Sequence, residues 1–243
     1  MSRNFELLER VAKEGSLNRG GMPEILRPPI PFPALKGSAK EEIAKLVQRL
    51  FFRGGHDGGP KIVSFSGIAC DDRSSWICAR AAEYLASQAD NPVCLVDANF
   101  RSPRLHTHYD VGNRTGWAAA LTTDGPIRTF ATPLPVKNLW LMPAGSAKPG
   151  LEANVGRCRA RLTELREEFD HVLVSAPPLA HENEATLMGQ LADGIVLIVE
   201  ANQSRRDSIR QAKEQLEAAQ VHLLGAVLDQ RTFPIPEFLY RRL

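Results

Sequence analysis

The sequence predicts an α/β domain with a doubly wound, mostly parallel sheet and helices on both faces. From residue 61 onward, short apolar runs rich in β-branched residues alternate with longer helical stretches. Several runs are apolar at consecutive positions, as expected for parallel strands that helices bury on both faces. The predicted strands are 62–65, 93–96, 139–142, 172–174, 195–199 and 223–228, and the predicted helices between them are 74–87, 151–169, 184–191 and 204–219.

The part of the chain before these strands has a different character. Five prolines lie between Pro23 and Pro33, which favours an extended, polyproline-like segment. A predicted helix then begins at Ser38, where Ser38 and Glu41 have the spacing of a capping box. We therefore divide the chain into an N-terminal extension, 1–37, and one α/β domain, 38–243. One apolar stripe follows the capping box, at Ile43, Leu46, Val47, Leu50 and Phe51.

Composition excludes several classes of protein. Hydrophobic residues make up 43% of the 243, enough for one sizeable core, and the formal net charge of +2 gives no case for nucleic acid as a partner. No run approaches the roughly 18 apolar residues of a spanning helix, and the start lacks the apolar region of a secretory signal. We expect a cytoplasmic protein whose membrane association, if any, is at the inner face and through a partner. The cysteines have no zinc spacing, so we expect mostly buried thiols.

The segment after the first predicted strand lies where a phosphate-binding loop, G-x-x-x-x-G-K-[ST], would lie between a strand and a helix. Gly67 matches the first glycine, and Ser74, followed by Ser75, matches the metal-binding hydroxyl. Asp72 replaces the second glycine, and Arg73 replaces the lysine. These four positions and Ser75 are the candidate nucleotide-binding residues, with Ser74 a candidate Mg²⁺ ligand.

The two replacements oppose phosphate binding on physical grounds. Backbone N–H groups and a helix N-terminus converge on phosphate oxygens in such a loop, and glycine permits that close approach. A carboxylate about 6 Å from a phosphate, at an effective dielectric of about 20, costs roughly 3 kcal/mol per charge pair. Arg73 keeps a positive charge, but its planar fork differs from an ammonium. Alternatively, residues 71–74 only cap the following helix, because acidic residues favour a first turn.

The segment after the second predicted strand carries a more specific pattern, hh-D-A-D-h-R-x-P-x-x-H. It resembles the second acidic motif of the bacterial tyrosine kinases encoded in capsule and exopolysaccharide operons. In that family the two aspartates serve Mg²⁺ and activate the attacking hydroxyl. Asp97 matches the first aspartate, Asn99 replaces the second, and Arg101, Pro103 and His106 match the rest. The resemblance makes Asp97, Asn99 and Arg101 the candidate catalytic residues, with Asp97 a second candidate for the metal.

Two later segments extend the resemblance. Residues 169–178 are similar to the family's third motif, Y/F-D-x-h-h-h-D-x-P-P, but Ser175 stands at the position of its acid. By its position in this motif, Ser175 is the fourth candidate catalytic residue. A serine can hold a metal-bound water, yet it lacks the carboxylate charge that favours Mg²⁺. Residues 224–228 resemble the family's L-G-h-V-h-N segment, with Asp229 where asparagine is usual. In all, the likeness covers about residues 38–230 and implies a P-loop NTPase-like fold related to MinD and ParA.

The resemblance also implies cofactors and partners. ATP and Mg²⁺ are the family's cofactors, and a membrane polysaccharide co-polymerase, or chain-length determinant, is its usual partner. Glu42, Lys45 and Arg49 lie approximately where the family has its oligomerisation helix, so a homo-oligomer is expected by analogy. The family's C-terminal tyrosine cluster is absent. Tyr240 is the one candidate phosphoacceptor in the tail, although we favour a packing role for it.

Three hypotheses follow. The favoured one is a catalytically impaired relative that regulates or scaffolds polysaccharide assembly, because four motif positions depart together: Asp72, Arg73, Asn99 and Ser175. The alternative is an active tyrosine autokinase or ATPase in which Arg73 replaces the lysine and Asp97, with residue 71 or 72, holds Mg²⁺. The third is a positioning switch like MinD and ParA, which is disfavoured because the loop lacks their second lysine.

Overall fold

The computed structural model describes residues 37–52, 59–69, 71–146, 154–180, 183–201 and 204–230, all within one compact unit. The predicted proline-rich extension, Cys70 and Tyr240 lie outside the described residues. The side chains of Ser38, Asp71 and Asp72 are likewise not described.

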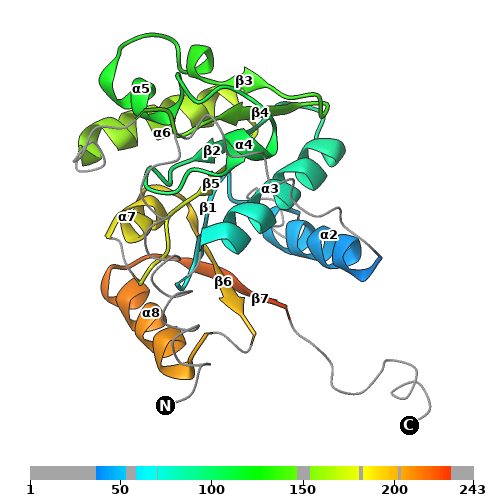
Figure 1. Ribbon diagram of the computed structural model, residues 1–243, viewed down its shortest axis with the longest axis vertical. Helices are drawn as coiled ribbons and strands as arrows, with labels where there is room; N and C mark the ends of the chain where they lie inside the picture. The colour runs from blue at the N-terminus through cyan, green and yellow to red at the C-terminus, as the bar shows by residue number, and fades with distance from the viewer. Residues whose placement is uncertain are drawn as a thin grey trace, which may run out of the picture. The chain divides into compact units, whose positions relative to one another are not determined.

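The sheet has seven strands in the order β3-β4-β2-β5-β1-β6-β7 (Figure 1). Every neighbouring pair is parallel except β3 with β4. The fold is therefore doubly wound and of the P-loop NTPase type, as predicted, and six of the strands lie where the apolar runs placed them. The strands are β1 Ile62–Gly67, β2 Val93–Asp97, β3 Thr132–Pro133, β4 Leu139–Met142, β5 His171–Ser175, β6 Gly194–Glu200 and β7 Leu223–Asp229.

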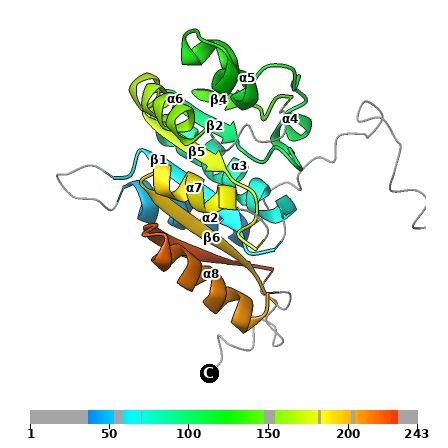
Figure 2. The ribbon, with the colours of Figure 1, turned by 90° about the vertical axis from the view of Figure 1, so that its left-hand side faces the viewer.

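Helices cover both faces of the sheet (Figures 1 and 2). Residues of α2, α3 and α4 pack with one buried cluster, and those of α5, α6, α7 and α8 pack with the other. Strands β1, β2 and β6 are buried at every position, which agrees with their mostly apolar sequences, IVSFSG, VCLVD and GIVLIVE. The helices are α2 Ser38–Phe51, α3 Asp71–Gln88, α4 Leu105–His108, α5 Trp117–Thr122, α6 Val155–Glu168, α7 Asn183–Leu191 and α8 Arg206–Ala218, with a 3₁₀ helix, η2, at Ile127–Phe130.

Of two predicted helix starts, one was confirmed and one was wrong. Helix α2 begins at Ser38, as predicted, although its N-cap is Gly37 and has no side-chain cap hydrogen bond. Gly37 has φ 45°, a left-handed value that favours glycine. Helix α6 begins at Val155 rather than at 151, because Asn154 Oδ1 accepts a hydrogen bond from the Arg157 N–H and caps the helix there.

Two sequence-based predictions, buried cysteine thiols and no membrane-spanning helix, can be compared with the described part of the chain. Cys78, Cys94 and Cys158 are free and buried, as expected. Burial raises the pKa of the Cys78 and Cys94 thiols, so both stay protonated at neutral pH. Among the described residues, no helix has the length and apolarity needed to cross a membrane.

Candidate functional site

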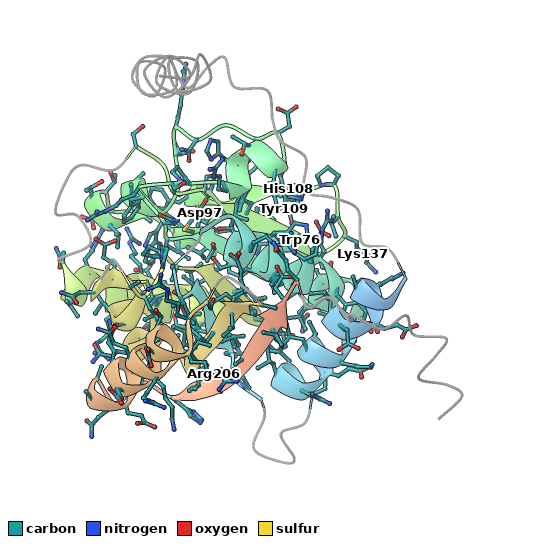
Figure 3. The ribbon with its side chains drawn as sticks, turned by 60° about the horizontal axis from the view of Figure 1, so that its bottom comes forward. Trp76, Asp97, His108, Tyr109, Lys137 and Arg206 are labelled. Carbon is teal, nitrogen blue, oxygen red and sulfur yellow. The ribbon has the colours of Figure 1, made fainter. Side chains whose placement is uncertain are left out.

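The carboxyl ends of the parallel strands meet at one edge of the sheet, where helix α3 also begins. Ligands of doubly wound sheets bind at this edge. Gly67, Asp97, Ser175 and Asp229 are the last residues of β1, β2, β5 and β7. Figure 3 labels Asp97 at the end of β2 and Trp76 near the start of α3. The candidate residues from three separate motifs therefore come together here.

Arg73 is held by the end of the sheet's last strand. Its Nε lies 2.5 Å from Asp229 Oδ2 and its Nη2 lies 2.8 Å from Asp229 Oδ1, so the pair is bidentate. The guanidinium also lies over the Trp76 ring, 4.6 Å from the ring centroid. The two side chains are only 26% and 14% exposed. The cation at the predicted lysine position is thus bound to a carboxylate of its own chain, in the fork geometry that arginine forms best.

Arg73 stands where the phosphate-binding loop would have its lysine, and its ion pair with Asp229 explains this replacement better than the loop sequence does. The resemblance places asparagine at this position, and an uncharged amide would not provide the counter-charge that Asp229 gives Arg73. The two departures form one ion pair, which links α3 to β7 across 156 residues of sequence. Sequence analysis noted both departures separately and missed that they are partners.

Ser175, at the position of the third motif's acid, pairs with a serine of α3. Ser75 Oγ and Ser175 Oγ lie 2.9 Å apart and are buried, joining α3 to β5 by a hydrogen bond. Ser74 is buried beside them, 1% exposed. Neutral hydroxyls do not provide the charge that favours Mg²⁺ over its own hydration shell. This part of the site is better suited to joining two elements than to binding a cation.

Asp97 keeps its carboxylate, and backbone amides surround it. Oδ1 accepts a hydrogen bond from the Asn99 N–H at 3.2 Å, and Oδ2 accepts from the N–H groups of Arg104 and Leu105, each at 3.1 Å. Arg104 is the N-cap of α4, so the carboxylate satisfies donors that the helix start leaves unpaired. Asp97 is fully buried and holds the turn between β2 and α4.

Asn99 lies two residues further along the same turn. It is 1% exposed, and its Oδ1 accepts a hydrogen bond from the Ser102 N–H at 3.1 Å. Its buried Nδ2 has no hydrogen-bond partner among the described residues. The amide oxygen, which is the atom of Asn99 that could ligate a cation, is bonded to the Ser102 N–H, and the side chain lacks the negative charge of the second acid. Arg101, the third predicted residue of this motif, is exposed.

The structure brings some predicted site residues together and separates others. Asp97 and Ser175 are register partners in β2 and β5. Glu42, Lys45 and Arg49 belong to α2, outside this group, and Glu42 pairs with Lys45 at 2.7 Å. A groove of about 580 Å³ lies along α2 and α3, lined by Lys45, Gln48, Arg49, Phe52, Tyr84 and Gln88. The roles predicted for all these residues stay predictions.

The described residues do not fit Mg-ATP. Arg73 is engaged by Asp229, Ser175 is paired with Ser75, and the Asp97 carboxylate is held by three N–H groups. Over the described ranges, no group of three or more His, Cys, Asp or Glu residues could hold a metal ion. We therefore derive no phosphoryl-transfer step from this geometry.

This arrangement of strands and this strand order define an α/β domain with the P-loop NTPase-like fold. Within that class the chain belongs to a particular family: the family model described as cellulose biosynthesis protein BcsQ matches residues 61–228.

Individual relatives confirm the resemblance to bacterial tyrosine kinases. The chain is 25% identical over 163 residues to tyrosine-protein kinase YwqD of Bacillus subtilis, covering 66% of this chain and 69% of that protein. The crystal structure of the chimerical protein CapA2B2 superposes with a TM-score of 0.74 at 20% identity, covering 82% of this chain and 87% of that one. The kinase domain of Escherichia coli tyrosine kinase ETK superposes with a TM-score of 0.71 at 20% identity, covering 82% of this chain and 80% of that one. At these identities the two structures show the fold alone.

Proposed function

We propose that this chain is a catalytically impaired member of its family that regulates or scaffolds exopolysaccharide or capsule assembly. It would act in the cytoplasm, at the inner face of the membrane, by binding a membrane co-polymerase. The observation that carries the proposal is the bidentate pair between Arg73 and Asp229, which uses the cation at the phosphate-loop position for an internal contact.

The electrostatic energy of the Arg73–Asp229 pair opposes nucleotide binding at this site. Two unit charges 4 Å apart attract by about 4 kcal/mol at an effective dielectric of about 20, and a bound phosphate would have to replace this attraction. Releasing Arg73 would also leave the mostly buried Asp229 carboxylate unpaired beside the phosphates. Phosphoryl transfer depends almost entirely on positioning and charge stabilisation. Ser175 and Asn99 remove two further charges from that stabilisation.

The proposed partner and self-association rest on surface features and on the relatives. The matching family is described as a cellulose biosynthesis protein, which places that family in polysaccharide assembly. On α2, the cations Lys45 and Arg49 line the groove beside Phe52, whose side chain is 54% exposed. Aromatic residues and arginine are enriched at protein–protein interfaces, so Phe52 and Arg49 are the features that favour an interface here. We therefore propose this face of α2 for association with a second copy.

Genetic complementation tests the scaffold function. In a host lacking the chain, we expect the variant Asn99→Ala with Ser175→Ala to restore polysaccharide yield as well as the unaltered chain does. Both substitutions change predicted catalytic positions and leave the α2 surface intact. The unaltered chain should also co-purify with the host's chain-length-determinant protein. Loss of polymer with the double variant, although it folds and accumulates normally, would favour the alternative of an active autokinase.

A further inference from the structure

Glu200 is a buried acidic residue that none of the sequence motifs includes. It is the last residue of β6 and is only 7% exposed. Its backbone N–H donates a hydrogen bond to Ser204 Oγ at 3.1 Å, but no residue of the described ranges donates a hydrogen bond to its carboxylate. Asp97, the other buried acidic residue in the described part of the chain, has three such donors. A buried carboxylate without a partner costs stability, so the charges around Glu200 decide its role.

The side chain of Glu200 lies on the face of the sheet that α3 covers. Side chains alternate between the two faces along a strand. In β6, Val196 and Ile198 pack in the cluster that contains residues of α3, and Glu200 continues that series. In β7, Val227 packs in the same cluster, and Asp229 continues the series. Glu200 and Asp229 are register partners, on strands whose backbones lie about 4.8 Å apart. Their carboxylates therefore share one corner of the site.

The two carboxylates at this corner face one guanidinium. Arg73 binds Asp229 through Nε and Nη2. A guanidinium has five N–H donors, so it can bind a second carboxylate as well. In the register of β1 and β6, Gly67 pairs with Ile198, so Glu200 extends two residues beyond the level at which the phosphate-loop position begins. A phosphate bound at this level would be repelled by both negative charges.

We propose that Glu200 is a second counter-ion for the cation at position 73 and binds it whenever Asp229 does not. Asp229 holds Arg73 in the structure, and Glu200 lies beside it on the neighbouring strand. Removing the charge of Asp229 therefore does not free the cation for a phosphate. Glu200 acts through Arg73, so it is a positioning residue. The inference deepens the proposed function, because it adds a second carboxylate that competes with phosphate for the same cation.

Urea denaturation of the full chain tests the second counter-ion. In the unaltered chain, Glu200→Gln should leave the urea midpoint unchanged or raise it, because no described residue bonds the carboxylate. In the Asp229→Asn chain, Arg73 should bind Glu200 instead. There the same substitution should lower the midpoint and raise the equilibrium constant of unfolding at least about fivefold. A side chain that only fills space would not reverse its effect in this way.

A second background makes the test independent of how well Asp229→Asn folds. In Arg73→Gln, the carboxylates of Glu200 and Asp229 face each other without the cation. Glu200→Gln should therefore raise the urea midpoint of Arg73→Gln by more than it raises that of the unaltered chain. Glu214→Gln, at an exposed carboxylate of α8, is the matched control and should shift the midpoint equally in every background.

Two results would overturn the inference. Equal shifts from Glu200→Gln in all three backgrounds would mean that its carboxylate does not interact with Arg73 or Asp229. A lower midpoint for Glu200→Gln in the unaltered chain would mean that the carboxylate already has a partner. The urea experiments contain no nucleotide. Binding of Mg-ATP by the unaltered chain would therefore contradict the proposed function and leave this inference intact.

Discussion

Asp97 and Asp229 are two acidic residues at the same edge of the sheet, and they are neutralised in different ways. Three backbone N–H groups hold Asp97, whereas the guanidinium of Arg73 holds Asp229. The first arrangement needs only the turn that follows β2. The second joins the start of α3 to the last strand, across 156 residues of sequence. The comparison teaches that one of these carboxylates depends on local backbone geometry, whereas the other depends on the packing of distant elements.

The largest expected effect comes from removing the Asp97 carboxylate. Asp97→Ala leaves three N–H groups without their acceptor, one in the turn after β2 and two at the start of α4, and should lower the free energy of unfolding by about 3 kcal/mol. Urea denaturation measures the loss. Asp97→Asn keeps one acceptor oxygen and should lower the free energy of unfolding by less than Asp97→Ala does. A loss below about 0.5 kcal/mol for Asp97→Ala would show that these hydrogen bonds do not hold the turn.

Breaking the ion pair should have the second-largest effect. Asp229→Asn and Arg73→Gln should each destabilise the fold by about 2 kcal/mol, and the double variant by less than the sum, because the pair is largely buried. A double-mutant cycle in urea measures the coupling. Arg206→Gln, at an exposed arginine of α8 labelled in Figure 3, is the matched control and should change stability by no more than about 0.5 kcal/mol. Strict additivity would contradict the pairing.

Asp193, just before β6, sharpens the comparison because its carboxylate is bound both by backbone N–H groups and by an arginine guanidinium. Burial raises the pKa of this carboxyl, but the hydrogen bonds from Arg166 and from the N–H groups of Ile62 and Lys61 lower it by more, so the net shift is downward from 3.8. A carboxyl whose pKa is lowered by folding stabilises the folded state at pH values above its ordinary pKa, and this stabilisation is lost as the pH falls through the lowered pKa. Asp193→Asn should therefore lower the free energy of unfolding by about 1–2 kcal/mol at pH 7. Thermal unfolding should show this deficit shrinking below about pH 4; a deficit independent of pH would contradict the assignment.

The smallest expected effect belongs to the serine pair. Ser75→Ala or Ser175→Ala leaves one buried hydroxyl unpaired and should lower stability by about 1 kcal/mol. The double variant should lose no more than either single one, since no hydroxyl then remains without a partner. Chemical denaturation of the three variants checks this. Additive losses would mean that the two hydroxyls act independently.

The sequence predicted the parts of the fold and site that depend on local pattern. Six strands followed from apolar runs, and the string around Asp97 indicated the resemblance to the bacterial tyrosine kinases, which the relatives confirm. The contacts that define the site could not be predicted, because Arg73 and Asp229 are 156 residues apart and Ser75 and Ser175 are 100 apart. Only sheet order and register bring them together. Strand β3 was missed because two residues carry no periodicity.

The most direct test is calorimetric titration of the purified chain with ATP and ADP, with and without Mg²⁺. As a positive control, a variant should restore the family's residues at the five departures: Asp72→Gly, Arg73→Lys, Asn99→Asp, Ser175→Asp and Asp229→Asn. We expect no detectable binding by the unaltered chain at millimolar nucleotide and measurable Mg²⁺-dependent binding by the restored variant. Micromolar, Mg²⁺-dependent binding by the unaltered chain would contradict the claim that Arg73 is committed to Asp229.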